Sequence, residues 1–99
     1  MRKTWAFFYM APNCHPNDQR ATIISDNRRT LIYGVSNVEA ACVLAKKLVE
    51  EDGCILIELC GAFQAEDARK VIHAVEGKVS VGYMTFFEDN LDKIHLIKD

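Results

Sequence analysis

The sequence lacks the features that would assign it to several large classes of proteins. Its 99 residues carry a formal net charge of −2, and charges of both signs alternate without a basic block or an acidic tail. A basic surface is what attracts nucleic acid and anionic membranes, so we expect neither partner. No apolar run approaches the roughly 20 residues that cross a bilayer. Internal repeats and low-complexity segments are also absent.

The N-terminus resembles a short signal peptide but lacks its processing site. Met1-Arg2-Lys3 is basic, and an apolar, aromatic stretch follows over residues 4–11. No small-x-small cleavage site comes after it, and the residues before Cys14 lack the aliphatic residue that precedes a lipidated cysteine. We therefore expect a cytoplasmic protein.

Metal and cofactor motifs are missing as well. The four cysteines are scattered, no C-x-x-C or H-x-x-x-H occurs, and Cys14-His15 is an adjacent pair. We expect reduced thiols and no metal. The turn over residues 61–64 joins a predicted strand to a predicted helix, yet neither G-x-G-x-x-G nor G-x-x-x-x-G-K is present. Glu66 and Asp67 already supply negative charge to the first helical turn, so no nucleotide and no other cofactor is expected.

The chain does contain what a globular domain needs. Hydrophobic residues make up 49% and charged residues 26%, typical of one domain spanning residues 1–99. Apolar and β-rich runs predict strands over 4–10, 30–35, 54–60 and 79–87. Helical spacing predicts a helix over 38–52, which a Ser36–Glu39 capping box opens and Gly53 ends. It predicts a second helix over 65–75, which Gly77 ends. A short helix is predicted from Asn17 to Ile24, and residues 91–99 are either a terminal helix or an edge strand, with 88–99 as a C-terminal extension.

This order predicts an α/β domain with a small four-stranded, mainly parallel sheet, βαβ units and helices packed on the sheet. Three of the four strands are apolar at both odd and even positions, so both faces of the sheet must be covered. Two good helices hardly cover both faces. We therefore expect a partner, a homodimer or larger oligomer of this chain. The alternative is a monomer in which residues 13–29 and 91–99 provide the cover.

Glu58 stands out because it is a carboxylate within the apolar run Cys54–Phe63. Strand alternation puts it on one face with Cys54, Leu56 and Cys60, one pleat before the strand ends. Ligands of open parallel sheets bind at the carboxyl ends of the strands. An unpaired buried carboxylate is unfavourable, so Glu58 either binds a ligand, acts as an acid or base, or ties neighbouring loops together through an arginine such as Arg28 or Arg29 or through a backbone N–H.

Cys60 is a weaker catalytic candidate. Glu58 lies two residues away on the same face, about 7 Å along the strand, and disfavours the thiolate. The following helix N-terminus favours it by roughly 0.3–1 kcal/mol. His15 is the one histidine that would act as a base, and only if the first loop folds over the site.

The candidate ligand-binding residues all lie at or near the predicted carboxyl ends of the strands. They are Glu58, Cys60, Gly61, Tyr9, His15, Ser36, Tyr83 and Thr85. Three hypotheses follow: a small-molecule-binding protein or enzyme that uses Glu58, a homo-oligomeric interaction module with a structural Glu58, or a redox sensor that uses Cys14 and Cys60.

Three segments carry a resemblance: Phe8–Pro12, Ile57–Phe63 and Val79–Tyr83. Together with Gly34-Val35 they resemble a family of small bacterial and archaeal proteins of unknown function, over roughly residues 4–85. Glu-Leu-Cys-Gly is the most specific part. That family often reads Gly-Gly-Phe-Gly after the cysteine, where this chain has Ala62 and Gln64. The resemblance implies a stand-alone domain and no particular chemistry.

Overall fold

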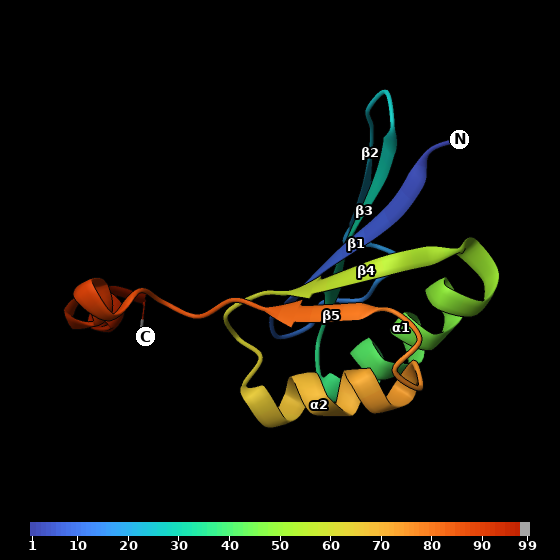
Figure 1. Cartoon of the computed structure of the whole chain (residues 1–99). Coiled ribbons are helices and arrows are strands. Elements are labelled where there is room, and N and C mark those ends of the chain that lie inside the picture. The colour runs from blue at the N-terminus through green and yellow to red at the C-terminus, as the bar shows by residue number, and fades with distance from the viewer. Residues whose placement is uncertain (98–99) are drawn as a thin grey trace.

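The computed structural model describes residues 1–97 and consists of one sheet, two α-helices and a terminal 3₁₀ helix (Figure 1). The expectation for residues 98 and 99 lies outside the described residues. The elements in chain order are β1 (Lys3–Met10), β2 (Arg20–Ile24), β3 (Arg28–Val35), α1 (Val38–Asp52), β4 (Cys54–Leu59), α2 (Ala65–Ala74), β5 (Ser80–Tyr83) and η1 (Glu88–Ile97).

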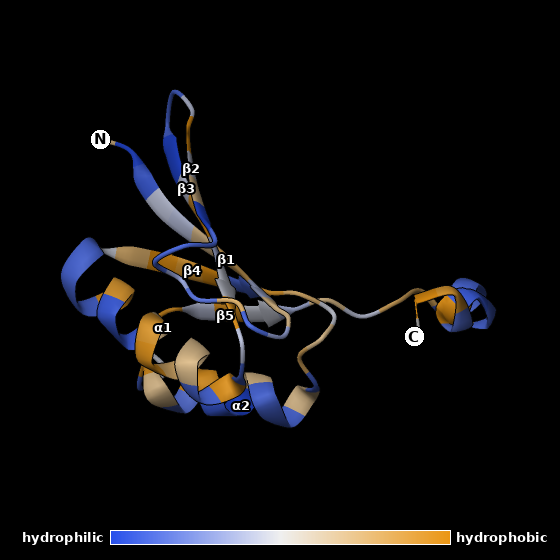
Figure 2. Ribbon diagram, turned by 180° about the vertical axis from the view of Figure 1, so that it is seen from behind, coloured by the Kyte–Doolittle hydropathy of each residue, from blue (hydrophilic) through white to orange (hydrophobic). Residues whose placement is uncertain are grey.

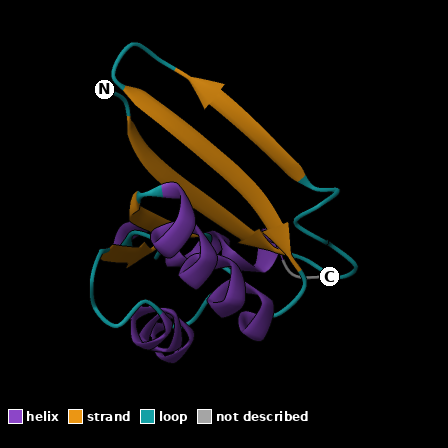
Figure 3. Cartoon of the chain, turned by 90° about the vertical axis from the view of Figure 1, so that its right-hand side faces the viewer, coloured by secondary structure: helices purple, strands orange, loops and turns teal. Residues whose placement is uncertain are grey.

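The sheet has five strands in the order β2-β3-β1-β4-β5, so the prediction of four was wrong. The α/β class, the mainly parallel pairing and the βαβ units are confirmed, since only the β2–β3 pair is antiparallel. The extra strand is β2, where a short helix was predicted. Residues 21–24 include β-branched side chains, and the tight turn after them, with Ser25 N–H donating to the Arg28 carbonyl at 2.8 Å, makes a hairpin (Figure 3).

The α1 helix begins and ends for local reasons. Asn37 is its N-cap, and its side-chain oxygen accepts the Ala40 N–H at 2.7 Å, so the predicted Ser36–Glu39 capping box was wrong by one residue. Gly53 ends the helix as predicted. Its φ of +67° is left-handed, and its N–H donates to the Leu48 carbonyl.

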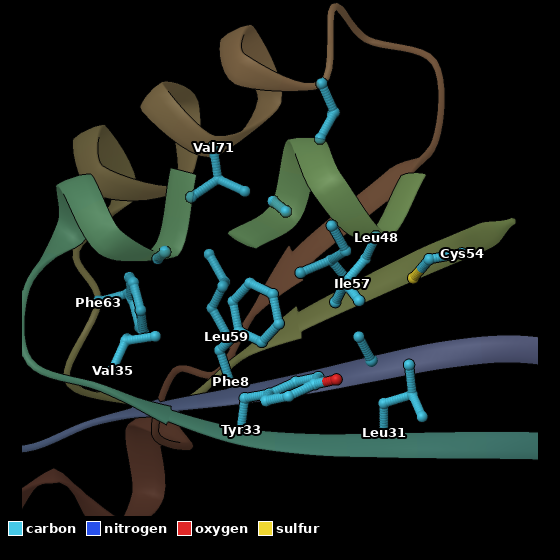
Figure 4. Close-up of a cluster of buried hydrophobic side chains, with 14 of the residues drawn as sticks. Phe8, Leu31, Tyr33, Val35, Leu48, Cys54, Ile57, Leu59, Phe63 and Val71 are labelled. Atoms are coloured by element: carbon cyan, nitrogen blue, oxygen red, sulfur yellow. The ribbon is translucent and has the colours of Figure 1, made fainter. Parts of the chain in front are cut away.

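Both α-helices pack on the same face of the sheet, which makes a two-layer domain (Figures 1 and 2). Inward residues of the three central strands meet the small and branched residues of α1 and α2 (Figure 4). The fully enclosed side chains at their contact include Phe8, Val35, Leu48, Ile57, Leu59, Phe63 and Val71. The alanines Ala41 and Ala45, both 0% exposed, let α1 approach the strands closely.

The other face of the sheet has no helix on it among residues 1–97. The strand registers put one set of outward side chains there, and we call this surface the open face. Its members include Lys3, Trp5, Phe7 and Tyr9 of β1, Arg28, Thr30, Ile32 and Gly34 of β3, Ala21 and Ile23 of β2, Leu56 and Glu58 of β4, and Ser80 and Gly82 of β5. As expected, apolar side chains occur on both faces of the sheet. Within residues 1–97, helices cover only one of these faces.

In the C-terminal region the helix alternative is observed, whereas the preceding strand is shorter than predicted. The strand expected over 79–87 is only four residues long, Ser80–Tyr83, because residues 84–87 leave the sheet. Residues 88–97 form η1, which extends away from both layers and gives the domain a longest dimension of 42 Å (Figures 1 and 2). We call residues 87–97 the C-terminal arm.

Candidate functional site

Glu58 lies on the open face and is exposed, whereas the sequence suggested a largely buried position. Its strand neighbours are Phe7 of β1 and Gly82 of β5. The predicted shared face with Cys54 was wrong, because a bulge opposite Thr4 and Trp5 shifts the register. Cys54 is therefore buried in the core, while Leu56 and Glu58 face outward.

A hollow of about 350 Å³ lies beside Glu58 at the carboxyl end of β4. Its wall consists of Phe7, Glu58, Leu59, Gly82, Tyr83 and Met84. Two of the predicted site residues, Glu58 and Tyr83, therefore do meet. The surroundings are apolar and aromatic with one carboxylate, an arrangement that suits a ligand with a cationic or hydrogen-bond-donating group.

The internal partners proposed for Glu58 are engaged elsewhere. The Arg28 guanidinium lies over the Trp5 ring, 4.0 Å from its centroid. Arg29 Nε donates to Thr4 Oγ1 at 3.3 Å. Glu58 takes part in no ion pair within residues 1–97. Neither Arg28 nor Arg29 therefore pairs with Glu58 in the way that the hypothesis of a structural Glu58 proposed.

Cys60 is tied to the backbone of β1. Its Sγ accepts the Met10 N–H at 3.4 Å, and its own N–H donates to the Phe8 carbonyl at 2.9 Å. Gly61, which follows, is a close-approach position, because a Cβ there would lie 2.7 Å from the Met84 Cε atom. The helix after this turn is capped by its own Asp67, whose Oδ2 accepts the Gln64 N–H at 2.9 Å. That carboxylate supports the expectation that the turn holds no phosphate.

Tyr9 lies across Gly34 rather than in the hollow beside Glu58. A Cβ on Gly34 would be only 2.6 Å from the Tyr9 ring, so glycine is what allows this position. Desolvation raises the pKa of the Tyr9 hydroxyl above its usual value, and the neighbouring Cys14 raises it further. Thr85 belongs to the exposed segment that leads into the C-terminal arm.

His15 and Ser36 lie at a different place, a groove of about 600 Å³ beside α1, on the helix side of the sheet. We call it the α1 groove. Its wall combines the loop before β2 with one side of the helix, and it is lined by Cys14, His15, Pro16, Asn17, Arg20, Tyr33, Ser36, Ala40, Val43, Leu44, Lys47, Leu48, Glu51 and Asp52. The eight predicted site residues are therefore distributed between two faces of the sheet, and they do not form one site.

The loop at the head of the α1 groove is held by its own hydrogen bonds. His15 N–H donates to Gln19 Oε1 at 2.7 Å, and Gln19 N–H donates back to the His15 carbonyl at 2.8 Å. Asn17 N–H donates to His15 Nδ1 at 3.1 Å. Because Nδ1 accepts a hydrogen bond, the ring proton of neutral His15 is on Nε2, which is then a donor.

Two cations of the α1 groove were not identified from the sequence. Arg20 stands at the start of β2, and its guanidinium lies over the Tyr33 ring, 5.5 Å from the centroid. Lys47 lies in the second half of α1, one turn before Glu51. The sequence does not identify Arg20 as a site residue, because residues 17–24 are predicted as a helix. The strand assignment places it opposite Tyr33, so the β-branched run after it was the signal.

Charge is distributed unevenly along the α1 groove. His15, Arg20 and Ser36 lie at the end nearest the N-terminus of α1, while Glu51 and Asp52 belong to its last turn. From Ala40 to Asp52 the helix rises about 18 Å. The middle is apolar, with Val43, Leu44 and Leu48. A ligand here would meet donors and a cation at one end and carboxylates at the other.

A third depression, of about 840 Å³, lies between α1 and α2. Most of its lining side chains are exposed, including Val43, Lys46, Arg69, Ile72 and His73. It is a dip in the outer surface of the helix layer. No group of three or more potential metal ligands occurs in residues 1–97. None of the helices described is long and apolar enough to span a membrane.

Comparisons with known proteins give one informative result. No curated protein and no solved structure matches the chain. A family described as "Family of unknown function (DUF6506)" matches residues 3–99, nearly the whole chain. The expected membership in a family of unknown function is confirmed. The chain belongs to this family.

Proposed function

We propose that the chain is a small-molecule-binding protein whose ligand is a small organic acid held in the α1 groove. The observation that carries this proposal is that Arg20, His15 and Lys47 line one groove of about 600 Å³, with Arg20 and His15 together at one end of its apolar middle. Ligand sites in proteins are typically concave, of about 300–1,000 Å³, and mostly apolar with a few polar groups. The α1 groove has a volume in this range and combines an apolar middle with polar and charged ends.

The polar end of the α1 groove is organised before any ligand arrives. Stacking on Tyr33 restricts the Arg20 guanidinium, and the loop hydrogen bonds restrict His15. A donor set that is already ordered loses less conformational entropy on binding. A guanidinium also matches the two oxygens of a carboxylate or phosphate. Both features support an acidic group of the ligand at this end.

The far end of the α1 groove limits the ligand further. Glu51 and Asp52 would repel a second negative charge there. The favoured ligand therefore has one acidic group, a short apolar body that contacts Val43, Leu44 and Leu48, and a neutral or donor group at the other end. Matched probes for this chemistry are benzoate, phenyl phosphate and benzylamine, which share a ring and differ in the charged group.

The predicted location beside Glu58 remains the second candidate, and the hollow of about 350 Å³ supports it. There Glu58 would act as hydrogen-bond acceptor or general base, with Tyr83 in the wall of the hollow. The two sites make opposite demands. The α1 groove favours an acid, and the Glu58 hollow favours an amine.

The test is a titration of the ¹⁵N-labelled chain with each probe, followed by NMR. Benzoate or phenyl phosphate should shift the amide signals of residues 14–20 and 36–47 in a saturable way. Arg20→Gln should raise the dissociation constant about 10- to 100-fold, since a hydrogen bond to a charged group contributes about 1.5–3 kcal/mol. Arg69→Gln, an exposed arginine outside the α1 groove, is the matched control.

The outcomes separate the two sites. No saturable shift with either acid at tens of millimolar would refute the α1 groove proposal. Saturable shifts of residues 58 and 82–84 with benzylamine, lost in Glu58→Gln, would move the function to the Glu58 hollow. Glu58→Gln should leave acid binding in the α1 groove unchanged, because the two sites lie on opposite faces of the sheet.

A further inference from the structure

We propose that two copies of the chain exchange their C-terminal arms, so that the arm of each copy packs on the open face of the other. The partner is thus a second copy of this chain, and the contact is reciprocal. The proposal is independent of ligand binding in the α1 groove. Three features of the arm and the open face support it: the exposed apolar side chains of the arm, its direction, and the match in size between the two surfaces.

The C-terminal arm is apolar on part of its surface and lies apart from the rest of the chain. Phe87 is 78% exposed, Leu96 70% and Ile97 66%. Figure 2 shows hydrophobic and hydrophilic stretches side by side on η1. Runs of 3₁₀ helix beyond three or four residues are uncommon, and an isolated helix of ten residues is marginal in water. Such a segment needs a surface to pack on.

The chain directs this segment away from its own body. Met84 is fixed to the end of β4, since its N–H donates to the Leu59 carbonyl at 3.0 Å. The side chains of Met84 and Phe86 both lie against Gly61. Residues beyond Phe87 then continue outward from the carboxyl ends of the strands (Figure 1). An arm that starts here contacts a second molecule more readily than it contacts the open face of its own chain.

Within residues 1–97, the open face has no helix or strand packed over it. Trp5, Phe7, Ile32 and Leu56 are only half-buried on it, and Ile23 is 53% exposed. The ten residues of η1 extend about 20 Å as a 3₁₀ helix, and the eight residues of β1 extend about 26 Å. The arm is therefore long enough to lie along most of the central strand.

The area also suits a stable dimer. The chain exposes 6841 Å² in all, about 70 Å² per residue, so an arm of eleven residues exposes roughly 750 Å². If each arm buries about half of this and an equal area of the open face, the two contacts together bury on the order of 1,500 Å². Standard protein–protein interfaces bury about 1,200–2,000 Å². The two-fold arrangement closes on itself, because each copy supplies one arm and one open face.

Isotope-filtered NMR tests the contact directly. A sample of equal parts ¹³C-labelled and unlabelled chain reports only contacts between copies. We expect cross-peaks from the side chains of Phe87, Leu91 and Leu96 to those of Trp5, Phe7 and Ile32. The same cross-peaks within one labelled copy, in a protein that sediments as a monomer, would refute exchange, because the arm would then fold back on its own sheet.

Analytical ultracentrifugation of variants tests which surfaces are responsible. Leu96→Asp with Ile97→Asp on the arm, and Ile23→Asp on the open face, should each raise the dimer dissociation constant at least 30-fold. Val43→Asp, at a position 72% exposed on α1, is the matched control and should not change it. All four positions are exposed in the single chain, so folding should be retained, which circular dichroism checks. A wild-type monomer at 100 µM, or a dimer that the arm variants leave intact, would overturn the proposal.

Discussion

Gly34, near the head of the α1 groove, is a position where neighbouring atoms leave no room for a side chain. This residue is buried in β3 opposite Tyr9, and its N–H donates to the Gln19 carbonyl at 2.8 Å. A Cβ added to Gly34 would lie 2.6 Å from the Tyr9 ring and 2.9 Å from the Gln19 Cβ. The Tyr9 ring can rotate away, whereas the Gln19 Cβ is fixed to the backbone of the loop. Gly34→Ala therefore has to displace that loop.

The expected cost is the difference of two effects. Overpacking of this kind costs about 1–3 kcal/mol, and replacing glycine in a strand with alanine returns about 0.4–1 kcal/mol through the unfolded chain. We expect Gly34→Ala to lower the free energy of unfolding by about 1–2 kcal/mol in urea denaturation. Gly82→Ala is the control, since a Cβ there meets nothing within 4 Å. It should be neutral or stabilising.

A double-mutant cycle identifies the source of this cost. If the clash with the Tyr9 ring causes most of the destabilisation, Gly34→Ala should lower the free energy of unfolding less in a Tyr9→Ala background than in the wild type. The coupling energy would then be about 0.5–1 kcal/mol. If the Gln19 contact dominates, the cost should be unchanged in that background. Equal stability of Gly34→Ala and Gly82→Ala would refute the packing argument altogether.

Two further predictions concern local interactions. Asn37→Ala should destabilise the protein by about 1 kcal/mol in urea denaturation, because the 2.7 Å cap to the Ala40 N–H is lost. Ser36→Ala should have a smaller effect. If Ser36→Ala were instead more destabilising than Asn37→Ala, the Ser36–Glu39 capping box predicted from the sequence would be favoured. Burial raises the pKa of the Cys54 thiol above its usual value, and the Leu56 backbone lowers it by a smaller amount. The folded state therefore holds the thiol proton more tightly than the unfolded chain. The resulting stability is fully present below the unfolded thiol pKa of about 8.5 and is lost as the pH rises through the folded pKa. Urea denaturation from pH 7.5 to 10 should show a steeper loss in the wild type than in Cys54→Ala, and parallel curves would contradict the shift.

Much of the fold could be predicted because its signals are local. Gly53 ends α1 by its left-handed conformation, and the helical spacing of Ala41, Ala45 and Leu48 identifies the buried side of that helix. Residues 20–24 were harder, since a polar segment after Asn17-Asp18 imitates a helix start. The tight turn at Asp26-Asn27 and the β-branched residues before it were the stronger signal.

The candidate site was less predictable because it depends on which face a side chain takes. Glu58 and Cys54 are four residues apart, and strict alternation places them together. The bulge between them reverses that relation, and nothing in the local sequence indicates where a bulge occurs. Likewise His15 and Ser36 lie near the strand ends as expected, yet the loop and α1 bring them to the helix side of the sheet.

The apolar pattern of the strands also explains why a carboxylate stands in the run Cys54–Phe63. A strand that packs on both faces is apolar throughout, and β4 is apolar on both faces up to Leu56. Glu58 interrupts the pattern on the open face only, at the carboxyl end, where residues 84–87 leave the sheet. If the arm of a second copy covers the open face from its carboxyl end, the Glu58 hollow becomes part of the contact between copies. Benzylamine binding to Glu58 would then depend on dimerisation, whereas acid binding in the α1 groove would not. Titrating both probes into Leu96→Asp with Ile97→Asp therefore distinguishes the two sites by their dependence on the arm.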